Sequence, residues 1–81
     1  MRLSQLPEDF KIYRLTMSNG SEYIVTGVTK SNIVNAPINF VELGNGTTIN
    51  KVYVVEFKLD IHETRDFVAK NKNKIVLKDN L

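Results

Sequence analysis

Cysteine and tryptophan are absent from this chain of 81 residues, and histidine occurs once. Without cysteine the protein has no disulfide, no thiolate zinc site, no iron–sulfur cluster and no thiol nucleophile. A single histidine is too few for a three-histidine zinc site within one chain. We therefore expect neither a metal site nor a cofactor. A chain this short must also use nearly all of its apolar faces to be stable.

Long apolar runs and a strong excess of one charge are missing as well. No segment approaches the roughly 18 apolar residues of a membrane-spanning helix, and residues 1–7 lack the apolar stretch of a signal peptide. Basic residues number 11 and acidic residues 9, and the net charge of +2 permits an anionic partner without requiring one. We expect one soluble cytoplasmic domain over 1–81 with a loose segment at 1–9, no membrane contact and no small-molecule substrate.

The residues that are present indicate a folded domain rich in β-strand. Apolar residues make up 42% of the chain and charged residues 25%, which are ordinary values for a globular protein. Asn19-Gly20 is a strong hairpin signal between alternating segments, and Gly44-Asn45-Gly46 predicts a second hairpin. The predicted strands span 10–17, 22–29, 38–43 and 47–59, and the stretch 30–37, with its asparagines and proline, is expected to be irregular.

The longest predicted strand, 47–59, exceeds the usual strand length of about five or six residues. We therefore expect it to bend and to serve two parts of the sheet. Gly27, inside the second predicted strand, predicts a bulge or a sharp bend. Alternation along the longest strand places four residues on one face: Tyr53, Val55, Phe57 and Leu59.

The spacing of apolar residues changes after the longest strand. Asp60 and Glu63 match a capping box. Apolar spacing of three and four residues then predicts a helix of about ten residues, whose inner stripe comprises Ile61, Thr64, Phe67 and Val68. Residues 74–78 are expected to form a short final strand, because its flanking lysines suit the edge of a sheet.

The element order β-β-β-β-α-β predicts a mainly β, α+β domain with one short C-terminal helix. A small curled antiparallel sheet and an SH3-like barrel both fit this order. An open α+β sheet with the helix across one face is the alternative.

Residues arranged for catalysis are sparse. His62 lies near Asp66, but the predicted apolar stripe leaves both on the solvent side of the helix. No serine stands in a Gly-x-Ser-x-Gly setting. The glycine-rich segment 44–48 joins two strands and lacks the lysine of a phosphate-binding loop. We therefore predict a non-catalytic protein.

Two predicted strands are apolar on both faces, which is more than one small core can cover. The surplus predicts an interface with another protein or with a second copy of the chain. Its expected residues are Ile38, Phe40, Val41, Leu43, Val52 and Val54.

Nucleic-acid binding is the alternative function. Small barrels bind single strands through exposed aromatic residues flanked by lysines. Tyr23 is the tyrosine expected to be exposed, because Ile24, Thr26 and Val28 can supply the inner face of its strand. The accompanying lysines are Lys51, Lys58, Lys70, Lys72, Lys74 and Lys78.

In size and composition, the Asn-Gly hairpins and the segment 46–51 resemble small accessory proteins of phages and prophages. The resemblance assigns no site residues. The strands that are apolar on both faces, at 38–43 and 52–57, motivate the leading hypothesis: a small phage or mobile-element accessory protein that binds a protein partner or itself through its sheet.

Overall fold

The computed structural model of this chain describes residues 5–44 and 46–71 and is of mixed α+β type. Three strands form an antiparallel sheet in the order β2-β1-β5, the main sheet, and β3 and β4 form a separate antiparallel pair. In chain order the elements are β1 (Ile12–Met17), β2 (Glu22–Thr26), α1 (Gly27–Asn35), β3 (Phe40–Glu42), β4 (Thr48–Asn50), β5 (Val54–Leu59) and α2 (Ile61–Asn71), with short 3-10 turns at Glu8–Phe10 and Lys51–Tyr53.

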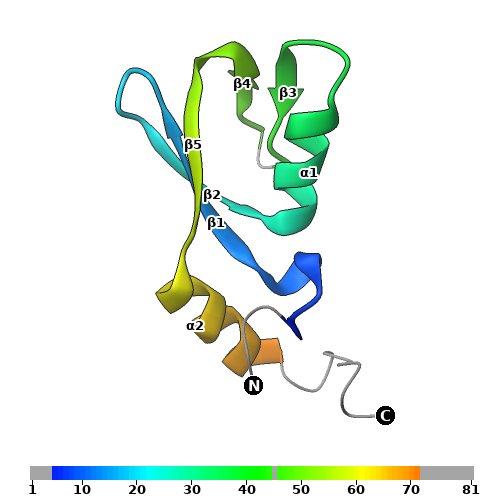
Figure 1. The fold of residues 1–81 in the computed structure, drawn as a ribbon, viewed down its shortest axis with the longest axis vertical. Coiled ribbons are helices and arrows are strands. Elements are labelled where there is room, and N and C mark those ends of the chain that lie inside the picture. The colour runs from blue at the N-terminus through cyan, green and yellow to red at the C-terminus, as the bar shows by residue number, and fades with distance from the viewer. Residues whose placement is uncertain (1–4, 45, 72–81) are drawn as a thin grey trace.

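The core lies on one face of the main sheet, between that sheet, α1 and the β3–β4 pair. Figure 1 shows α1 and the β3–β4 pair together on one side of β5, while α2 continues from the far end of β5. The buried cluster joins Leu15 of β1, Val25 of β2, Ile33 of α1 and Ile49 of β4. Burying one such aliphatic side chain contributes about 1.5–3 kcal/mol, so the cluster ties the helix and the small sheet to the main sheet.

The predicted architecture is found in part. The strands are antiparallel, but the two sheets stay separate and a closed barrel is not found. The C-terminal helix is confirmed as α2, and the Asp60 Oδ1 caps it by accepting a hydrogen bond from the Glu63 N–H at 3.0 Å. Neither described helix has the length and apolar character needed to cross a membrane. The predicted strand at 74–78 lies outside the described residues.

Helix α1 corrects the prediction of a strand at 22–29 followed by an irregular stretch at 30–37. β2 ends at Thr26, whose Oγ1 accepts a hydrogen bond from the Thr29 N–H at 3.2 Å and so caps the helix. β-branched residues and asparagines give this segment a low helix propensity. Burial of Ile33, which is 1% exposed, therefore stabilises a helix that local sequence preference does not favour.

The described part of the N-terminal segment lies beside α1. Leu6 is buried, and the 3-10 turn at Glu8–Phe10 lies against the start of α1. Gly27 opens that helix instead of forming the predicted bulge. A Cβ at Gly27 would lie 2.5 Å from the Glu8 backbone oxygen, so only glycine fits this close approach.

The bend predicted within 47–59 is confirmed. β4 pairs with β3, and β5 pairs with β1. The 3-10 turn Lys51–Tyr53 separates the two strands and lets one continuous stretch serve two sheets.

The facing predicted for this stretch is correct for Phe57 and wrong for Tyr53 and Val55. Val54 and Phe57 pack against the core cluster, whereas Val55 is 65% exposed. The pairing of β1 with β5 shifts between Thr16 and Met17, where β5 carries one extra residue. This bulge breaks the strict alternation on which the prediction relied.

Thr64 joins α2 to the beginning of β1. Its side chain is fully buried, and Oγ1 accepts from the Ile12 N–H at 3.0 Å and donates to the Ile12 carbonyl at 3.2 Å. The Asp60 N–H donates to the same carbonyl at 2.8 Å. β5 ends at Leu59, so no further strand residue pairs fully with Ile12. The Thr64 hydroxyl instead binds the N–H and the C=O of Ile12. The rings of Phe10 and Phe67 contact each other, with their centroids 5.7 Å apart, and so join α2 to the N-terminal turn.

Replacing Thr64 tests this junction. Thr64→Val keeps the shape but leaves the buried Ile12 N–H without its acceptor, so the free energy of unfolding should fall by about 1–3 kcal/mol. Thr64→Ser keeps the hydroxyl and loses one methyl group, which should cost about 1 kcal/mol. Urea unfolding followed by circular dichroism measures both. Equal losses would show that the hydroxyl does not hold the junction.

Candidate functional site

The residues predicted to form a protein interface divide into two groups of different burial. Three of them are 66%, 65% and 63% exposed: Ile38, Phe40 and Val52. The others are partly buried and pack against the core cluster: Val41, Leu43 and Val54. The apolar surplus predicted from the sequence is therefore found on the surface, but only part of the predicted residue set contributes to it.

An apolar groove lies between α1 and β5, beside the exposed Val52. Its volume is ≈ 580 Å³, and Val34 of α1 and Val55 of β5 line it with Ile33 and Phe57. Val34 and Val55 are 59% and 65% exposed. The sequence did not reveal either as an interface residue, because α1 has weak helix propensity and the bulge in β5 places Val54 instead of Val55 against the core.

The turn that follows β4 shapes one end of the groove. The Lys51 backbone N–H donates to the Asn39 carbonyl at 2.8 Å, and the Lys51 Nζ donates to the Ala36 carbonyl at the end of α1. The Asn50 Oδ1 accepts from the Val52 N–H at 3.1 Å. These bonds hold the turn close to α1 and leave the Val52 side chain in solvent.

β5 is an edge strand of the main sheet. The Asp60 N–H donates to the Ile12 carbonyl at 2.8 Å, so Ile12 and the alternate residues of β1 direct their backbone groups toward β5. The same alternation directs the N–H and C=O of Phe57 and Leu59 away from β1. No strand of the described chain pairs with β5 on that side. An edge of this kind is a template for another extended segment.

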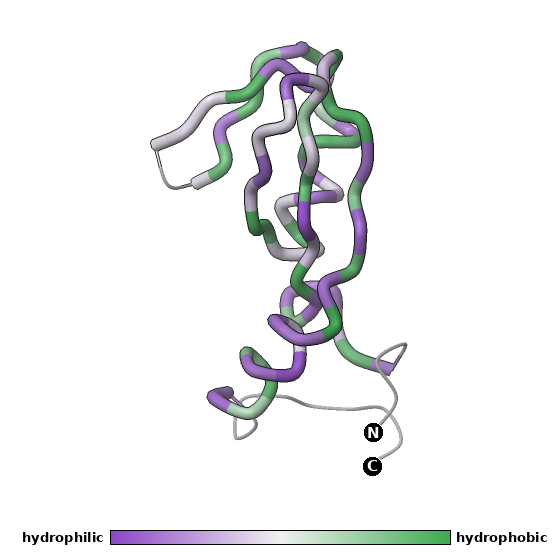
Figure 2. The backbone as a smooth tube through the Cα atoms, turned by 90° about the vertical axis from the view of Figure 1, so that its left-hand side faces the viewer, coloured by the Kyte–Doolittle hydropathy of each residue, from purple (hydrophilic) through white to green (hydrophobic). Residues whose placement is uncertain are grey.

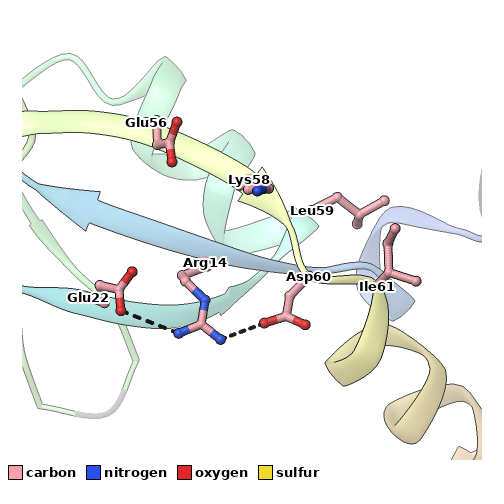
Figure 3. A pocket seen from close by; sticks show the side chains of 7 residues that line it. All are labelled: Arg14, Glu22, Glu56, Lys58, Leu59, Asp60 and Ile61. Carbon is pink, nitrogen blue, oxygen red and sulfur yellow. Dashed lines mark hydrogen bonds and ion pairs between the residues drawn. The ribbon is translucent and has the colours of Figure 1, made fainter.

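A second hollow, of ≈ 410 Å³, lies on the opposite face of the main sheet and is charged (Figure 3). Arg14 bridges two carboxylates in it: Nη2 lies 2.7 Å from the Asp60 Oδ2, and Nη1 lies 3.4 Å from the Glu22 Oε1. Glu56 and Lys58 of β5 line the same hollow. Both signs of charge are present, so the surface does not concentrate a field of one sign.

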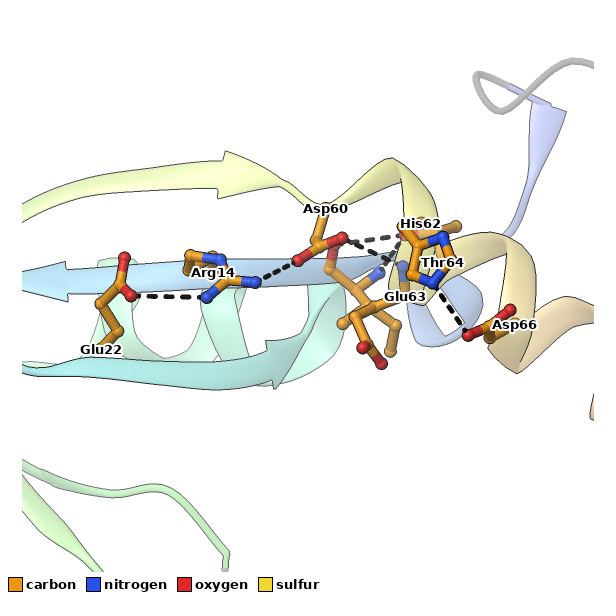
Figure 4. Close-up of polar contacts among 8 residues, drawn as sticks. Arg14, Glu22, Asp60, His62, Glu63, Thr64 and Asp66 are labelled. Carbon is orange, nitrogen blue, oxygen red and sulfur yellow. Dashed lines mark hydrogen bonds and ion pairs between the residues drawn. The ribbon is translucent and has the colours of Figure 1, made fainter.

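Asp60 connects the charged hollow to α2 (Figure 4). Its Oδ1 accepts from the Glu63 N–H, and its Oδ2 pairs with Arg14. The Glu63 N–H and then the Arg14 guanidinium lower the pKa of the Asp60 carboxyl below its ordinary value. The hydrogen bond that Arg14 donates to Asp60 in turn raises the pKa of Arg14. The perturbed pKa of Asp60 thus has a structural cause, which is the capping of the helix and the ion pair.

His62 lies on the exposed side of α2, as the apolar stripe predicts. Its Nε2 is 3.5 Å from the Asp66 Oδ2, and the two side chains are 84% and 55% exposed (Figure 4). Over residues 5–44 and 46–71, no three histidine, aspartate or glutamate side chains gather in the manner of a metal-ligand set. The pair is a solvated contact between neighbouring turns of the helix.

The predicted exposure of Tyr23 is wrong. Tyr23 lies opposite the fully buried Leu15 in the β1–β2 pairing and packs against the core cluster. Ile24, expected to face inward, is 49% exposed on the other face of the sheet. Tyr53, placed on the inner face by alternation, is instead 57% exposed. Pairing with β1, which local alternation does not reveal, decides which face of β2 is buried.

The lysines proposed for nucleic acid do not share one described surface. Lys51 lines the apolar groove, Lys58 lines the charged hollow on the opposite face, and Lys70 is exposed on the last turn of α2. The remaining predicted lysines lie outside the described residues: Lys72, Lys74 and Lys78.

No family model, curated protein or solved structure matches this chain. In the charged hollow, Arg14 is already paired with Glu22 and Asp60. On the other side, no described strand pairs with the outer edge of β5, and the apolar side chains Val34 and Val55 of the groove are exposed. Figure 2 shows that hydrophilic residues prevail along α2, whereas hydrophilic and hydrophobic residues are interspersed along the strands.

The lowered pKa of Asp60 predicts a specific pH dependence of stability. The unfolded carboxyl has a pKa of about 3.9, and the folded pKa is lower. The stabilisation is therefore complete above the unfolded pKa and is lost as the pH falls through the folded one. Asp60→Asn retains the capping oxygen but neither the charge nor the titration. It should be less stable than the wild type at neutral pH and should lose less stability below about pH 4.

Denaturant midpoints measured across this pH range test the prediction. Asp9→Asn is the matched control, since Asp9 is exposed and makes no ion pair among the described residues. If Asp60→Asn follows the wild-type profile, the ion pair and the charged cap do not stabilise the fold.

Proposed function

We propose that this chain is a small non-catalytic protein-interaction module that binds an extended protein segment along the β5 edge and the adjoining apolar groove. One observation carries the proposal. The outward-directed backbone groups of Phe57 lie beside a groove lined by Val34 and Val55. An extended segment bound there gains main-chain hydrogen bonds from the edge, and the groove receives its alternate side chains.

The composition of the surface supports this proposal. Contiguous exposed apolar residues are uncommon on monomeric proteins and mark interaction sites. Here they surround the groove, and Lys30, Lys51 and Glu56 stand among them. An apolar centre with polar groups at its margin is the usual make-up of a protein–protein interface. The segment that fits has apolar side chains at alternate positions on the side facing the groove.

Substitution of the groove wall tests the proposal. Val55→Lys places a charge at the edge and in the groove, and the high exposure of Val55 should let the variant fold. Ile24→Lys makes the same change on the opposite face of the main sheet and is the matched control. Peptides selected from a random library against the full chain should bind Val55→Lys at least about tenfold more weakly and should bind Ile24→Lys as they bind the wild type.

Fluorescence anisotropy with a labelled selected peptide measures the three affinities. Failure to select any peptide contradicts the proposal. So does a set of peptides whose affinity is the same for all three proteins, because such peptides bind elsewhere on the chain.

A further inference from the structure

The edge of β5 has a charge pattern that complements itself. Glu56 and Lys58 flank Phe57; both are exposed, and neither forms an ion pair within the described chain. Across the sheet, Lys58 lies opposite Arg14, which is a like charge, and Glu56 lies opposite Thr16. Neither charge of β5 therefore meets an opposite charge directly across the strand on the β1 side.

Building on the function proposed above, we propose that the segment bound by β5 is β5 of a second copy of this chain. The two strands run antiparallel about a twofold axis that passes through Phe57. In this register Glu56 of each copy stands directly opposite the partner's Lys58, so the contact contains two cross-strand ion pairs. The two main sheets then continue into one another across the axis.

The backbone of β5 agrees with this register. Residues opposite each other in an antiparallel pair alternate between hydrogen-bonded and non-hydrogen-bonded positions. Phe57 directs its N–H and C=O outward, so it can exchange both hydrogen bonds with the partner's Phe57. An axis through Glu56 or Lys58 would instead oppose like charges, at positions whose backbone groups already face β1.

The apolar groove also takes part in this contact. Val55 lies opposite the partner's Leu59 in the same register, at the wall that Val55 and Val34 form. The pairing thus covers apolar surface on one face of the joined sheet and forms ion pairs on the other face. This division suits strands whose successive side chains point to opposite faces.

β2, the other edge strand of the main sheet, does not have a charge pattern that complements itself. β2 carries Glu22 as its one charged residue. A twofold pairing of β2 with itself therefore forms no ion pair. Because a twofold interface must complement itself, β5 is the edge suited to join two copies.

Charge reversal on β5 tests the register and not only the oligomeric state. Glu56→Lys or Lys58→Glu alone converts both ion pairs into repulsive contacts and should weaken self-association by about tenfold or more. An equimolar mixture of the two variants restores both pairs in a mixed dimer. The double variant E56K/K58E restores them within one kind of chain. Both positions are exposed, and circular dichroism checks that each variant is folded.

Sedimentation equilibrium of the full chain at low ionic strength gives the readout, because salt screens exposed pairs. We expect a dimer for the wild type, the mixture and the double variant, and monomers for each single variant at the same concentration. A monomeric wild type overturns the pairing, as does a dimer that neither single reversal weakens.

The test separates this inference from the function on which it rests. A monomeric wild type that still binds library peptides in a manner sensitive to Val55→Lys overturns the twofold pairing and leaves the proposed function standing. A monomer without such binding overturns both. A monomer whose Phe57 and Leu59 amides are protected from hydrogen exchange indicates that a segment of the same chain, such as 74–78, covers the edge, and it also overturns the pairing.

Discussion

The backbone of Ile12 is the point at which the main sheet and α2 are joined. The Thr64 hydroxyl binds its N–H and its C=O, and the Asp60 N–H donates to the same carbonyl. This last bond continues the pairing of β1 with β5. It thereby determines which residues of β5 direct their backbone N–H and C=O toward β1 and which direct them toward the open edge. The Asp60 side chain caps α2 and pairs with Arg14. The hydrogen bonds of the buried Ile12 backbone thus fix α2 and the end of β5 relative to β1, and with them the positions of the charged hollow and of the open edge.

The two faces of the main sheet differ in whether their exposed side chains have partners within the described chain. On the charged face, Arg14 holds Asp60 and Glu22, and this network has a structural role. On the other face, α1 and the β3–β4 pair cover the core but leave a groove beside β5. A small domain has too little interior to bury every apolar residue of its strands. The exposed apolar surface adjoins backbone groups of β5 that no described strand pairs with, and the proposed binding rests on this arrangement.

The candidate site was predictable in kind but only partly in its residues. Strands that are apolar on both faces predict an uncovered apolar surface, and Ile38, Phe40 and Val52 belong to it. Of these, only Val52 lines the groove, together with Val34 and Val55, and neither Val34 nor Val55 was predictable from local patterns. The position of Val34 depends on a helix stabilised by burial of its neighbour, and that of Val55 depends on a bulge set by the pairing with β1. Both are consequences of contacts between residues distant in the sequence.

Features that depend on neighbouring residues could be predicted from local sequence patterns. These are the hairpin at Asn19-Gly20, with its positive φ at Gly20, the helix capped by Asp60 and the bend within 47–59. Turn geometry, helix capping and strand length act over a few residues and can be read locally. Tertiary packing makes 27–35 helical and keeps the two sheets from closing into a barrel. It also decided that Tyr23 faces inward, because packing and strand register outweigh weak local preferences.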